Sequence, residues 1–263
     1  MGTPWRRPGR RHDTAGMVLS SRQVDAFVER GFVRLEAAFS RPLALTCQSV
    51  LWEQLGPLAP GDTSTWDRPV VRLGSQGAAP FRKAVASRRW LDAIQQLAGP
   101  KALAHPHLAG TVVVRFPVEG DPGDDGWHID TSYRQDGHDD WWVNHRSRGR
   151  ALLMLVLLSD IDQTDAPTRL RVGSHHDIAS ALVPFHDRGI PSSDTPDLVS
   201  ATDHRPVDLA TGQAGDVYLC HPFLVHAAHR HRGTTPRFLA QPGVLLAEDY
   251  THDDTSPVAA VLA

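Results

Sequence analysis

Apolar residues near the start of the chain recur at helical spacing. Ser20 followed three residues later by Gln23 is typical of a helix start, and Gly31 ends the first apolar face. The same spacing predicts two more helices, over 42–55 and 88–98, each followed by a glycine. The first hundred residues are therefore predicted to be mainly helical.

After residue 100 the apolar positions fall instead in short β-rich runs separated by Gly, Pro and Asp. These runs cover 111–116, 151–158, 170–172, 217–220 and 238–246. Many short strands with turn residues between them are typical of a jelly roll. We therefore predict a mainly β fold with flanking N-terminal helices, a double-stranded β-helix of the cupin-like kind.

The length of 263 residues allows one sizeable domain with flanking helices, with two small domains as the alternative. We expect this domain over 18–263, with a helical part at 18–100 and the jelly-roll core at 101–247. Residues 1–17 are rich in Arg, Gly and Pro and are predicted to be a flexible leader, with Met17 as an alternative start. Twin arginines in this leader precede no apolar segment, so a signal peptide is not predicted.

Charge and cysteine content narrow the class of protein. A net charge of −3 and an isoelectric point near 6.6 give no bulk attraction to nucleic acid or to a membrane surface. The chain has no apolar run of the length that spans a bilayer. Cys47 and Cys220 lack a CxxC spacing and are expected to be free thiols. Together these features predict a cytoplasmic protein with a small-molecule partner and leave its oligomeric state open.

His-x-Asp pairs are the first candidate chemistry. Four occur: His128/Asp130, His138/Asp140, His175/Asp177 and His252/Asp254. Because about one or two are expected by chance in a chain with this much His, context has to choose between them. The three pairs that begin at His138, His175 and His252 lie in polar or turn sequence and are interpreted as solvated loops. His128 instead follows a β-branched strand and a turn, and a long downstream segment can return to it.

His226 and Arg237 complete the pattern that begins at His128. Two imidazoles and one carboxylate, from His128, His226 and Asp130, form a three-ligand face that suits non-haem Fe(II) and leaves positions open for substrates. Arg237 follows His226 by 11 residues, so in neighbouring antiparallel strands both side chains can enter one cavity. A guanidinium there can grip a carboxylate bidentately. Taken singly, each His could be a core residue and Arg237 a surface charge; the joint order favours a metal site.

These motifs resemble the phytanoyl-CoA dioxygenase superfamily of Fe(II)/2-oxoglutarate-dependent oxygenases. The matching elements are His128-x-Asp130, a Gly-Ser-His turn at 173–175, and His226 followed by Arg237, within a resemblance over roughly residues 18–247. The resemblance implies that the two histidines and Asp130 are catalytic and hold Fe(II), and that Arg237 holds the far carboxylate of 2-oxoglutarate. Dioxygen is then the other co-substrate.

One position departs from the family pattern. Many members have Ser or Thr two residues after the distal His, where it helps to hold the co-substrate, and here that residue is Ala228. By position, Thr111 and Arg115 match places from which family members contact 2-oxoglutarate, although the residue types differ. The alternative for these two is a polar strand residue and a charge at a strand end.

The segment after the first two ligands is predicted to form the substrate wall, because loops on a rigid scaffold commonly do so. Its candidate substrate contacts are Tyr133, Arg134, Trp141 and Trp142, with Asn144, His145 and Arg146 in the same loop. Trp66, Arg72 and Phe81 are expected to cover the mouth of the site. For each of these residues ordinary surface packing is the alternative.

The function predicted is therefore an Fe(II)- and 2-oxoglutarate-dependent dioxygenase that oxidises, most simply hydroxylates, a C–H bond of a small molecule. Lys occurs only as Lys83 and Lys101 among 27 basic residues, which indicates a GC-rich genome and bacterial specialised metabolism. A cupin-type isomerase, lyase or 2-oxoglutarate-independent dioxygenase is an alternative in which Arg237 lacks a purpose. A non-catalytic binding barrel is another, against which all three ligand types are present. Desaturation, cyclisation and epimerisation also stay open as outcomes.

Overall fold

The computed structural model describes residues 17–103 and 110–262, so the predicted leader lies outside the described residues except for Met17. Helix α1 spans Ser21–Arg30 and begins as predicted. The Ser20 side chain accepts a hydrogen bond from the Gln23 amide, and the Gln23 side chain accepts one from the Ser20 amide. Gly31 ends the helix with a left-handed φ of 87° and donates to the carbonyl of Phe27.

The remaining helices agree with the prediction only in part. They are α2 (Arg41–Trp52), α3 (Ala79–Val85), α4 (Arg88–Ala98), α5 (Ser174–Leu182) and α6 (Thr195–Ser200), with short 3-10 turns at Thr63–Thr65, Val183–Arg188, Ser192–Asp194 and Ala259–Val261. Helix α4 has the predicted bounds, and α2 ends three residues early. Helices α3, α5 and α6 were not predicted, because each has fewer than three turns and thus little periodic signal. No described helix is both long and apolar enough to cross a bilayer.

A large antiparallel sheet carries most of the predicted strands. Its order is β1 (Phe32–Leu35), β11 (Val217–Cys220), β7 (Arg150–Leu157), β13 (Arg237–Gln241), β4 (Thr111–Arg115) and β2 (Val70–Leu73), with β14 (Gly243–Leu246) pairing β7 and β3 (Ala102–Leu103). The run predicted as one strand at 238–246 is two strands, because Pro242 lies between them and has no N–H to donate. Strands β1 and β2, from the predominantly helical first hundred residues, belong to this sheet as well.

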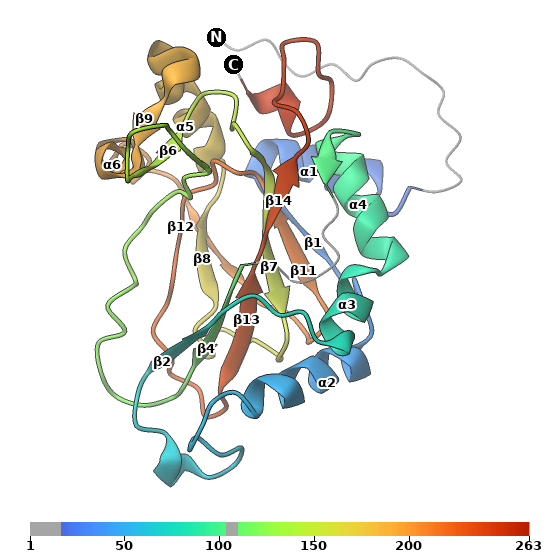
Figure 1. Ribbon diagram of the computed structural model, residues 1–263, viewed down its shortest axis with the longest axis vertical. Helices are drawn as coiled ribbons and strands as arrows, with labels where there is room; N and C mark the ends of the chain where they lie inside the picture. Colours follow the sequence, from blue (N-terminus) through green and yellow to red (C-terminus); the bar gives the residue numbers. More distant parts are fainter. Residues whose placement is uncertain (1–16, 104–109, 263) are drawn as a thin grey trace.

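Two smaller sheets complete the β structure. One consists of β10 (Val207–Ala210), β8 (Thr168–Arg171) and β12 (His226–Ala227), and the other of β5 (Tyr133–Arg134), β6 (Trp141–Val143) and β9 (Ile190–Pro191). Figure 1 shows β8 and β12 on one side of the large sheet and helices α1 to α4 on the other.

The core lies on both faces of the large sheet, since side chains alternate along each strand. On β7, Met154 and Val156 belong to the apolar cluster shared with the N-terminal helices, where Trp90 donates its indole N–H to the Met154 sulfur at 3.3 Å. Leu155 points the other way and packs with Leu170 of β8, between the sheets. Both cysteines are buried free thiols, as predicted.

The interpretation of His175 as a solvated loop residue is wrong. It lies in α5 with no exposed surface, and its Nε2 is 3.0 Å from the carbonyl oxygen of Val28, so it ties α5 to α1. A short polar sequence after a Gly-Ser turn is equally compatible with a buried helix start, which the sequence pattern did not distinguish. His138 and His252 are exposed, as interpreted.

Two buried histidines make the protein sensitive to acid. Burial lowers the pKa of His221 to about 3, and burial together with His221 holds the pKa of His175 well below its ordinary value. Unfolded histidine protonates near pH 6.5, so the unfolded chain binds more protons as the pH falls below that value. The free energy of unfolding should then decrease by up to about 1.4 kcal/mol per pH unit for each histidine. Denaturant titrations of the metal-free protein between pH 7.5 and 5 measure this, and His221→Gln should reduce the slope; an equal slope contradicts it.

Candidate metal centre

The structure brings His128, Asp130 and His226 together. One ligand atom from each lies within 4.8 Å of the other two. The backbone explains the meeting of the two histidines, because His128 and His226 form an antiparallel bridge in which each amide donates to the other's carbonyl at 3.0 Å. Their ring centroids are 4.3 Å apart. Residues almost a hundred positions apart therefore face one another as cross-strand neighbours.

Each imidazole is oriented by a carbonyl of its own segment. Nδ1 of His128 lies 2.9 Å from the carbonyl oxygen of Gly126, and Nδ1 of His226 lies 3.0 Å from that of Leu224. An Nδ1–H that donates to a carbonyl leaves the Nε2 lone pair free for a cation. Burial, and next the adjacent His128, lowers the pKa of His226 to about 4, so this ring is neutral at pH 7.

Arg150 at the start of β7 holds the carboxylate of Asp130. Its Nη1 is 2.6 Å from Oδ2 of Asp130, whereas Oδ1 lies 4.0 Å from Nε2 of His226. Burial opposes the charge of Asp130 and is the largest influence, yet Arg150 and the two histidines together outweigh it. The pKa of Asp130 therefore lies below its usual value. One carboxylate oxygen is fixed by Arg150, and the other is free to bind a cation.

A cavity of about 220 Å³ extends from the two histidines into the space between the sheets. Its lining residues are Arg72, Thr111, Val113, Arg115, Asp124, His128, Thr168, His226, Ala228, Arg237 and Gln241. Three arginines and one aspartate among them make the cavity basic overall. The cavity therefore has the size and charge for a small anionic ligand beside the metal-binding residues.

Arg237 is a buried cation without an acidic partner among the described residues. It is only 2% exposed, its Nη1 donates to the carbonyl of Ala166 at 2.5 Å, and its buried Nε has no hydrogen-bond partner. Burial, reinforced by Arg115 and only partly opposed by Asp124, lowers the pKa of Arg237 to about 9, so it stays charged at pH 7. An uncompensated buried charge is costly, which indicates that a ligand supplies the missing anion.

Arg115 lies directly opposite Arg237 in the register of β4 and β13 but has its own counter-ion. Its Nη2 donates to both oxygens of Asp124 at 2.6 Å, and Asp124 also pairs with Arg72. Only 3% of Arg115 is exposed, and its Nε has no partner. Asp124 is shared between Arg115 and the half-exposed Arg72, so Arg237 is the one of the two buried arginines in the cavity that has no ion pair within the described part of the chain.

Thr168 lies opposite Ala228, the position that departs from the family pattern. Strands β8 and β12 pair Leu170 with His226 and Arg169 with Ala227, so the same register places Thr168 opposite Ala228. Thr168 is 3% exposed and lines the cavity. A hydroxyl is therefore present at this wall, supplied by the neighbouring strand.

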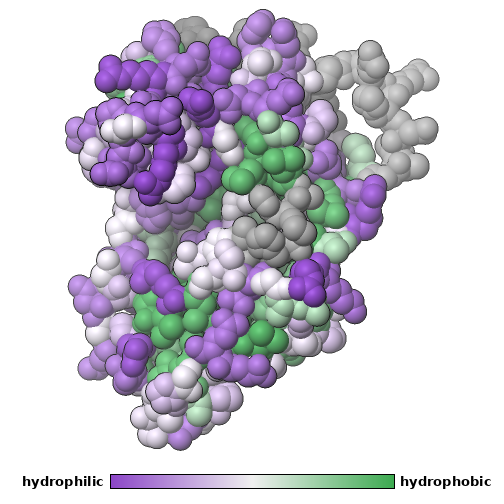
Figure 2. Space-filling view, in the orientation of Figure 1, coloured by the Kyte–Doolittle hydropathy of each residue, from purple (hydrophilic) through white to green (hydrophobic). Residues whose placement is uncertain are grey.

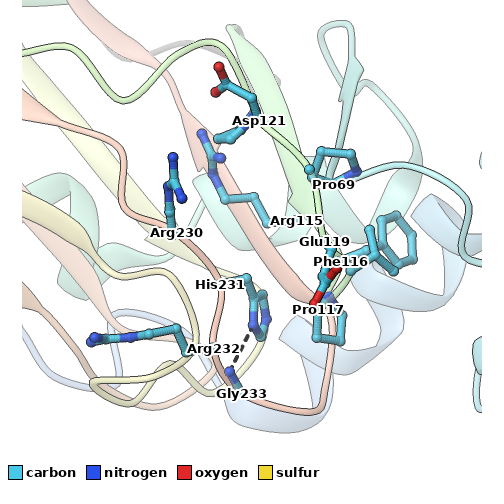
Figure 3. Close-up of a pocket in the computed structure, with 13 residues that line it drawn as sticks. Pro69, Arg115, Phe116, Pro117, Glu119, Asp121, Arg230, His231, Arg232 and Gly233 are labelled. Carbon is cyan, nitrogen blue, oxygen red and sulfur yellow. Dashed lines mark hydrogen bonds between the residues drawn. The ribbon is translucent and has the colours of Figure 1, made fainter.

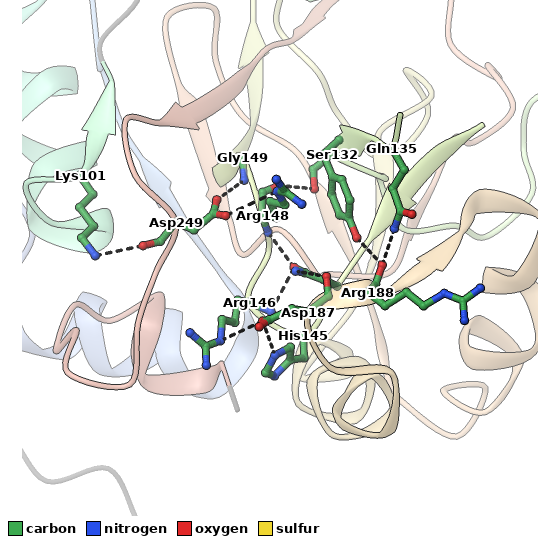
Figure 4. A network of polar contacts seen from close by, with 12 residues as sticks. Lys101, Ser132, Gln135, His145, Arg146, Arg148, Gly149, Asp187, Arg188 and Asp249 are labelled. Atoms are coloured by element: carbon green, nitrogen blue, oxygen red, sulfur yellow. Dashed lines mark hydrogen bonds and ion pairs between the residues drawn. The ribbon is translucent and has the colours of Figure 1, made fainter. Parts of the chain in front are cut away.

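The four predicted substrate contacts do not line this cavity. Tyr133 is buried and donates its hydroxyl to the carbonyl of Arg188 at 2.8 Å, to which the Gln135 side chain also donates (Figure 4). Trp142 is buried beside a second pocket formed with residues 184–194, whereas Trp141 is exposed and lies under the guanidinium of Arg134 at 4.9 Å. These roles stay predictions.

The neighbouring loop residues are part of a polar network. Asn144 donates to the carbonyl of Asp187, and His145 and Arg146 lie 3.2 and 3.4 Å from the Asp187 carboxylate (Figure 4). This end of the molecule, at the upper left of Figure 2, is correspondingly hydrophilic. The network fixes residues 144–146 to the segment around Asp187.

Trp66 and Phe81 do not cover the mouth of the site. Both are buried in the cluster between the helices and the large sheet, 8% and 1% exposed respectively. Their apolar rings pack against the outer face of the sheet, which sequence position alone could not show. Arg72 does reach the cavity, where it pairs with Asp124.

A third pocket, called the outer pocket below, adjoins the basic end of the cavity. It has a volume of about 640 Å³ and is formed by Pro69, Arg115, residues 116–122 and the loop 230–233 (Figure 3). Arg115 lines both spaces and so forms part of the wall between them. Arg230 and Arg232 belong to the outer pocket alone.

Comparisons with known proteins identify a family model that matches this chain and solved structures with a similar fold. The family model described as phytanoyl-CoA dioxygenase matches residues 61–239. None of the curated protein sequences matches this chain. Among solved structures, SnoK, described as a non-haem alpha-ketoglutarate-dependent carbocyclase from nogalamycin biosynthesis, is 17% identical with a TM-score of 0.58. That match covers 88% of this chain and 85% of SnoK.

Two further structures show the same architecture. HygX from Streptomyces hygroscopicus, with nickel and 2-oxoglutarate bound, is 20% identical with a TM-score of 0.57, over 87% of this chain and 88% of HygX. EctD from S. alaskensis, with iron bound, is 22% identical with a TM-score of 0.56, over 90% of this chain and 79% of EctD. At sequence identities this low, the similarity shows the fold alone. It confirms the predicted jelly-roll fold.

Proposed function

The chain belongs to the phytanoyl-CoA dioxygenase family of Fe(II)/2-oxoglutarate-dependent oxygenases, and we propose that it hydroxylates a C–H bond of a small molecule in bacterial specialised metabolism. Hydroxylation is the simplest outcome because it needs no further reactive group from the protein. The solved structures with this fold include a carbocyclase and an epimerase from nogalamycin biosynthesis, so other outcomes occur on the same architecture.

The donor set fits a ferrous ion. His128 and His226 each have an Nε2 left free by the bond at Nδ1, and Asp130 has one oxygen not held by Arg150. Two neutral imidazoles and one carboxylate are the usual protein ligands of a non-haem iron that activates dioxygen. When bound, iron and 2-oxoglutarate supply the oxidising chemistry, in which 2-oxoglutarate becomes succinate and carbon dioxide.

The buried and unpaired charge of Arg237 is the observation that carries the proposal. A dicarboxylate whose other end lies at the histidines would place its far carboxylate at the basic end of the cavity, where Arg237 has a free Nε. The hydroxyl of Thr168 can donate to the same ligand. A cupin-type enzyme that does not use 2-oxoglutarate, or a non-catalytic barrel, gives no reason to bury this arginine without a counter-ion.

The remaining residues keep the cavity ordered. Asp124 holds Arg115 in place, Arg150 fixes one oxygen of Asp130, and the side chain of Val113 contributes an apolar wall. Positioning the ligand and excluding water are the contributions that the protein itself makes to such an oxidation.

Turnover of 2-oxoglutarate in the absence of the prime substrate tests the function without knowing that substrate. Protein reconstituted anaerobically with Fe(II) and then exposed to air should convert 2-oxoglutarate slowly to succinate. Chelation of the iron should stop the conversion. Succinate formation that is equal with and without iron would exclude the proposed reaction.

A further inference from the structure

Arg169 of β8 contacts both segments that carry the metal-binding histidines. Its Nε donates to the carbonyl of Ala228 at 2.9 Å, two residues after His226. Its Nη2 donates to the carbonyl of Asp125 at 2.5 Å, three residues before His128. The side chain of Arg169 therefore joins two segments that are distant from each other in the sequence. Neither segment adjoins β8 along the chain.

We propose that Arg169 is a positioning residue that sets the spacing of His128 and His226, an inference that rests on the metal centre proposed above. The two histidines are joined by a single isolated bridge, whose two hydrogen bonds have no continuing ladder on the side of His128. Arg169 adds two charge-assisted bonds to this short contact, one on each segment. Such bonds are stronger than those between neutral groups.

The position of Arg169 suits this role because its own backbone is well anchored. It lies on the central strand of the small sheet, where its register partner is Ala227, next to His226. Its guanidinium also lies over the ring of Trp127, with Cζ 4.7 Å from the ring centroid, directly before His128. A planar fork with several fixed donors can bond two carbonyls at once, which a lysine ammonium on a flexible stem does poorly.

Arg171 provides a matched control on the same strand. Its guanidinium lies over the same ring of Trp127, at 4.3 Å, but its hydrogen bonds go to the carbonyl of Val199 and the hydroxyl of Thr202, at 2.7 and 2.8 Å. It therefore fastens α6 rather than the two histidine segments. Arg171 also forms an ion pair with Asp203 at 2.5 Å. Arg169 and Arg171 share strand, charge and aromatic contact, and differ in that Arg169 alone holds carbonyls of the two histidine segments.

Anaerobic titration of the metal-free protein with Co(II), followed through its visible d–d bands, separates the two roles. Arg169→Ala should weaken Co(II) binding by about tenfold, the lower end of the loss seen when a ligand's own hydrogen-bond partner is removed, because Arg169 holds the ligand segments rather than the ligands, and should shift the bands. Arg169→Lys should lose a smaller part of the affinity. Arg171→Ala should lower the thermal stability and leave the Co(II) affinity within about twofold of the wild type.

Equal losses of affinity in the Arg169→Ala and Arg171→Ala variants, or an unchanged affinity in Arg169→Ala, would overturn the role. If Arg169→Ala does not fold, the Lys variant decides: weaker Co(II) binding supports the role, and wild-type binding refutes it. His226→Ala is titrated in parallel. Wild-type affinity in that variant would show that the metal centre itself is misassigned, whatever Arg169 does.

Discussion

Replacement of His226 by alanine is expected to abolish stoichiometric binding of Fe(II). The variant loses a neutral nitrogen donor from the most buried ligand and leaves only the exposed His128 and the half-buried Asp130. The affinity should fall by more than the roughly 10- to 100-fold that loss of a ligand's hydrogen-bonding partner usually causes. Anaerobic titration of the metal-free protein with Fe(II) measures the loss, and 2-oxoglutarate turnover should disappear with it.

His138→Ala is the matched control for this experiment. His138 begins another His-x-Asp pair of the chain, but its side chain is exposed and lies outside the cavity. The control should bind one Fe(II) per chain with wild-type affinity. Unchanged iron stoichiometry in both His128→Ala and His226→Ala would exclude this metal centre.

Arg237→Lys is expected to raise the concentration of 2-oxoglutarate needed for half-maximal turnover by about tenfold or more. Lysine keeps the positive charge but lacks the planar guanidinium that can bond both oxygens of a carboxylate. A hydrogen bond to a charged group contributes about 1.5–3 kcal/mol. Arg237→Gln, which also removes the charge, should raise the required concentration of 2-oxoglutarate further.

Because the charge of Arg237 is buried without an ion pair to any described residue, the Gln variant should unfold no more readily than the wild type when 2-oxoglutarate is absent.

Arg230→Gln removes a charge from the adjoining outer pocket without touching the cavity, and it should leave the requirement for 2-oxoglutarate nearly unchanged (Figure 3). Equal requirements in the wild type and both Arg237 variants would mean that another group holds the far carboxylate. Arg115, directly opposite in the sheet, would then be the first candidate.

Much of the fold was predictable because its signals are local. The capping box at Ser20, the left-handed Gly31 and the β-branched run of β4 each specify an element within a few residues. The short helices α3, α5 and α6 carry too few turns for a periodic pattern. The burial of His175 depends on a carbonyl of α1 that is 147 positions away in the sequence, which no local pattern reports.

The residues of the candidate site also fall into those that the sequence identified and those that it did not. His128, Asp130, His226 and Arg237 were found because residue type, order and strand context coincide, and the structure brings the three ligands together as predicted. Their partners were missed, because a partner is selected by register between strands rather than by spacing along one strand. Thr168 could have been identified as an inward-facing residue. It lies two positions before the buried Leu170, and residues two positions apart on a strand share one face of the sheet.

The partners of the ligands illustrate the same limit of sequence patterns. Arg150, at the start of β7, holds Asp130 twenty positions earlier in the chain, and Asp124 pairs with Arg115 nine positions earlier. Arginine is common in this chain, so residue type alone gave no reason to choose these particular ones. Only the folded arrangement of the strands identifies which arginine meets which carboxylate.

The backbone bridge between His128 and His226 holds both imidazoles in place before any ion arrives. A preformed set of two nitrogens and one oxygen accepts any first-row divalent ion with little rearrangement, and such sets bind nickel, copper and zinc more tightly than ferrous iron in the Irving–Williams order. The geometry of these three side chains therefore gives iron no advantage over its competitors. Selection of iron over its competitors then depends on the metals that the cell makes available to the folded protein.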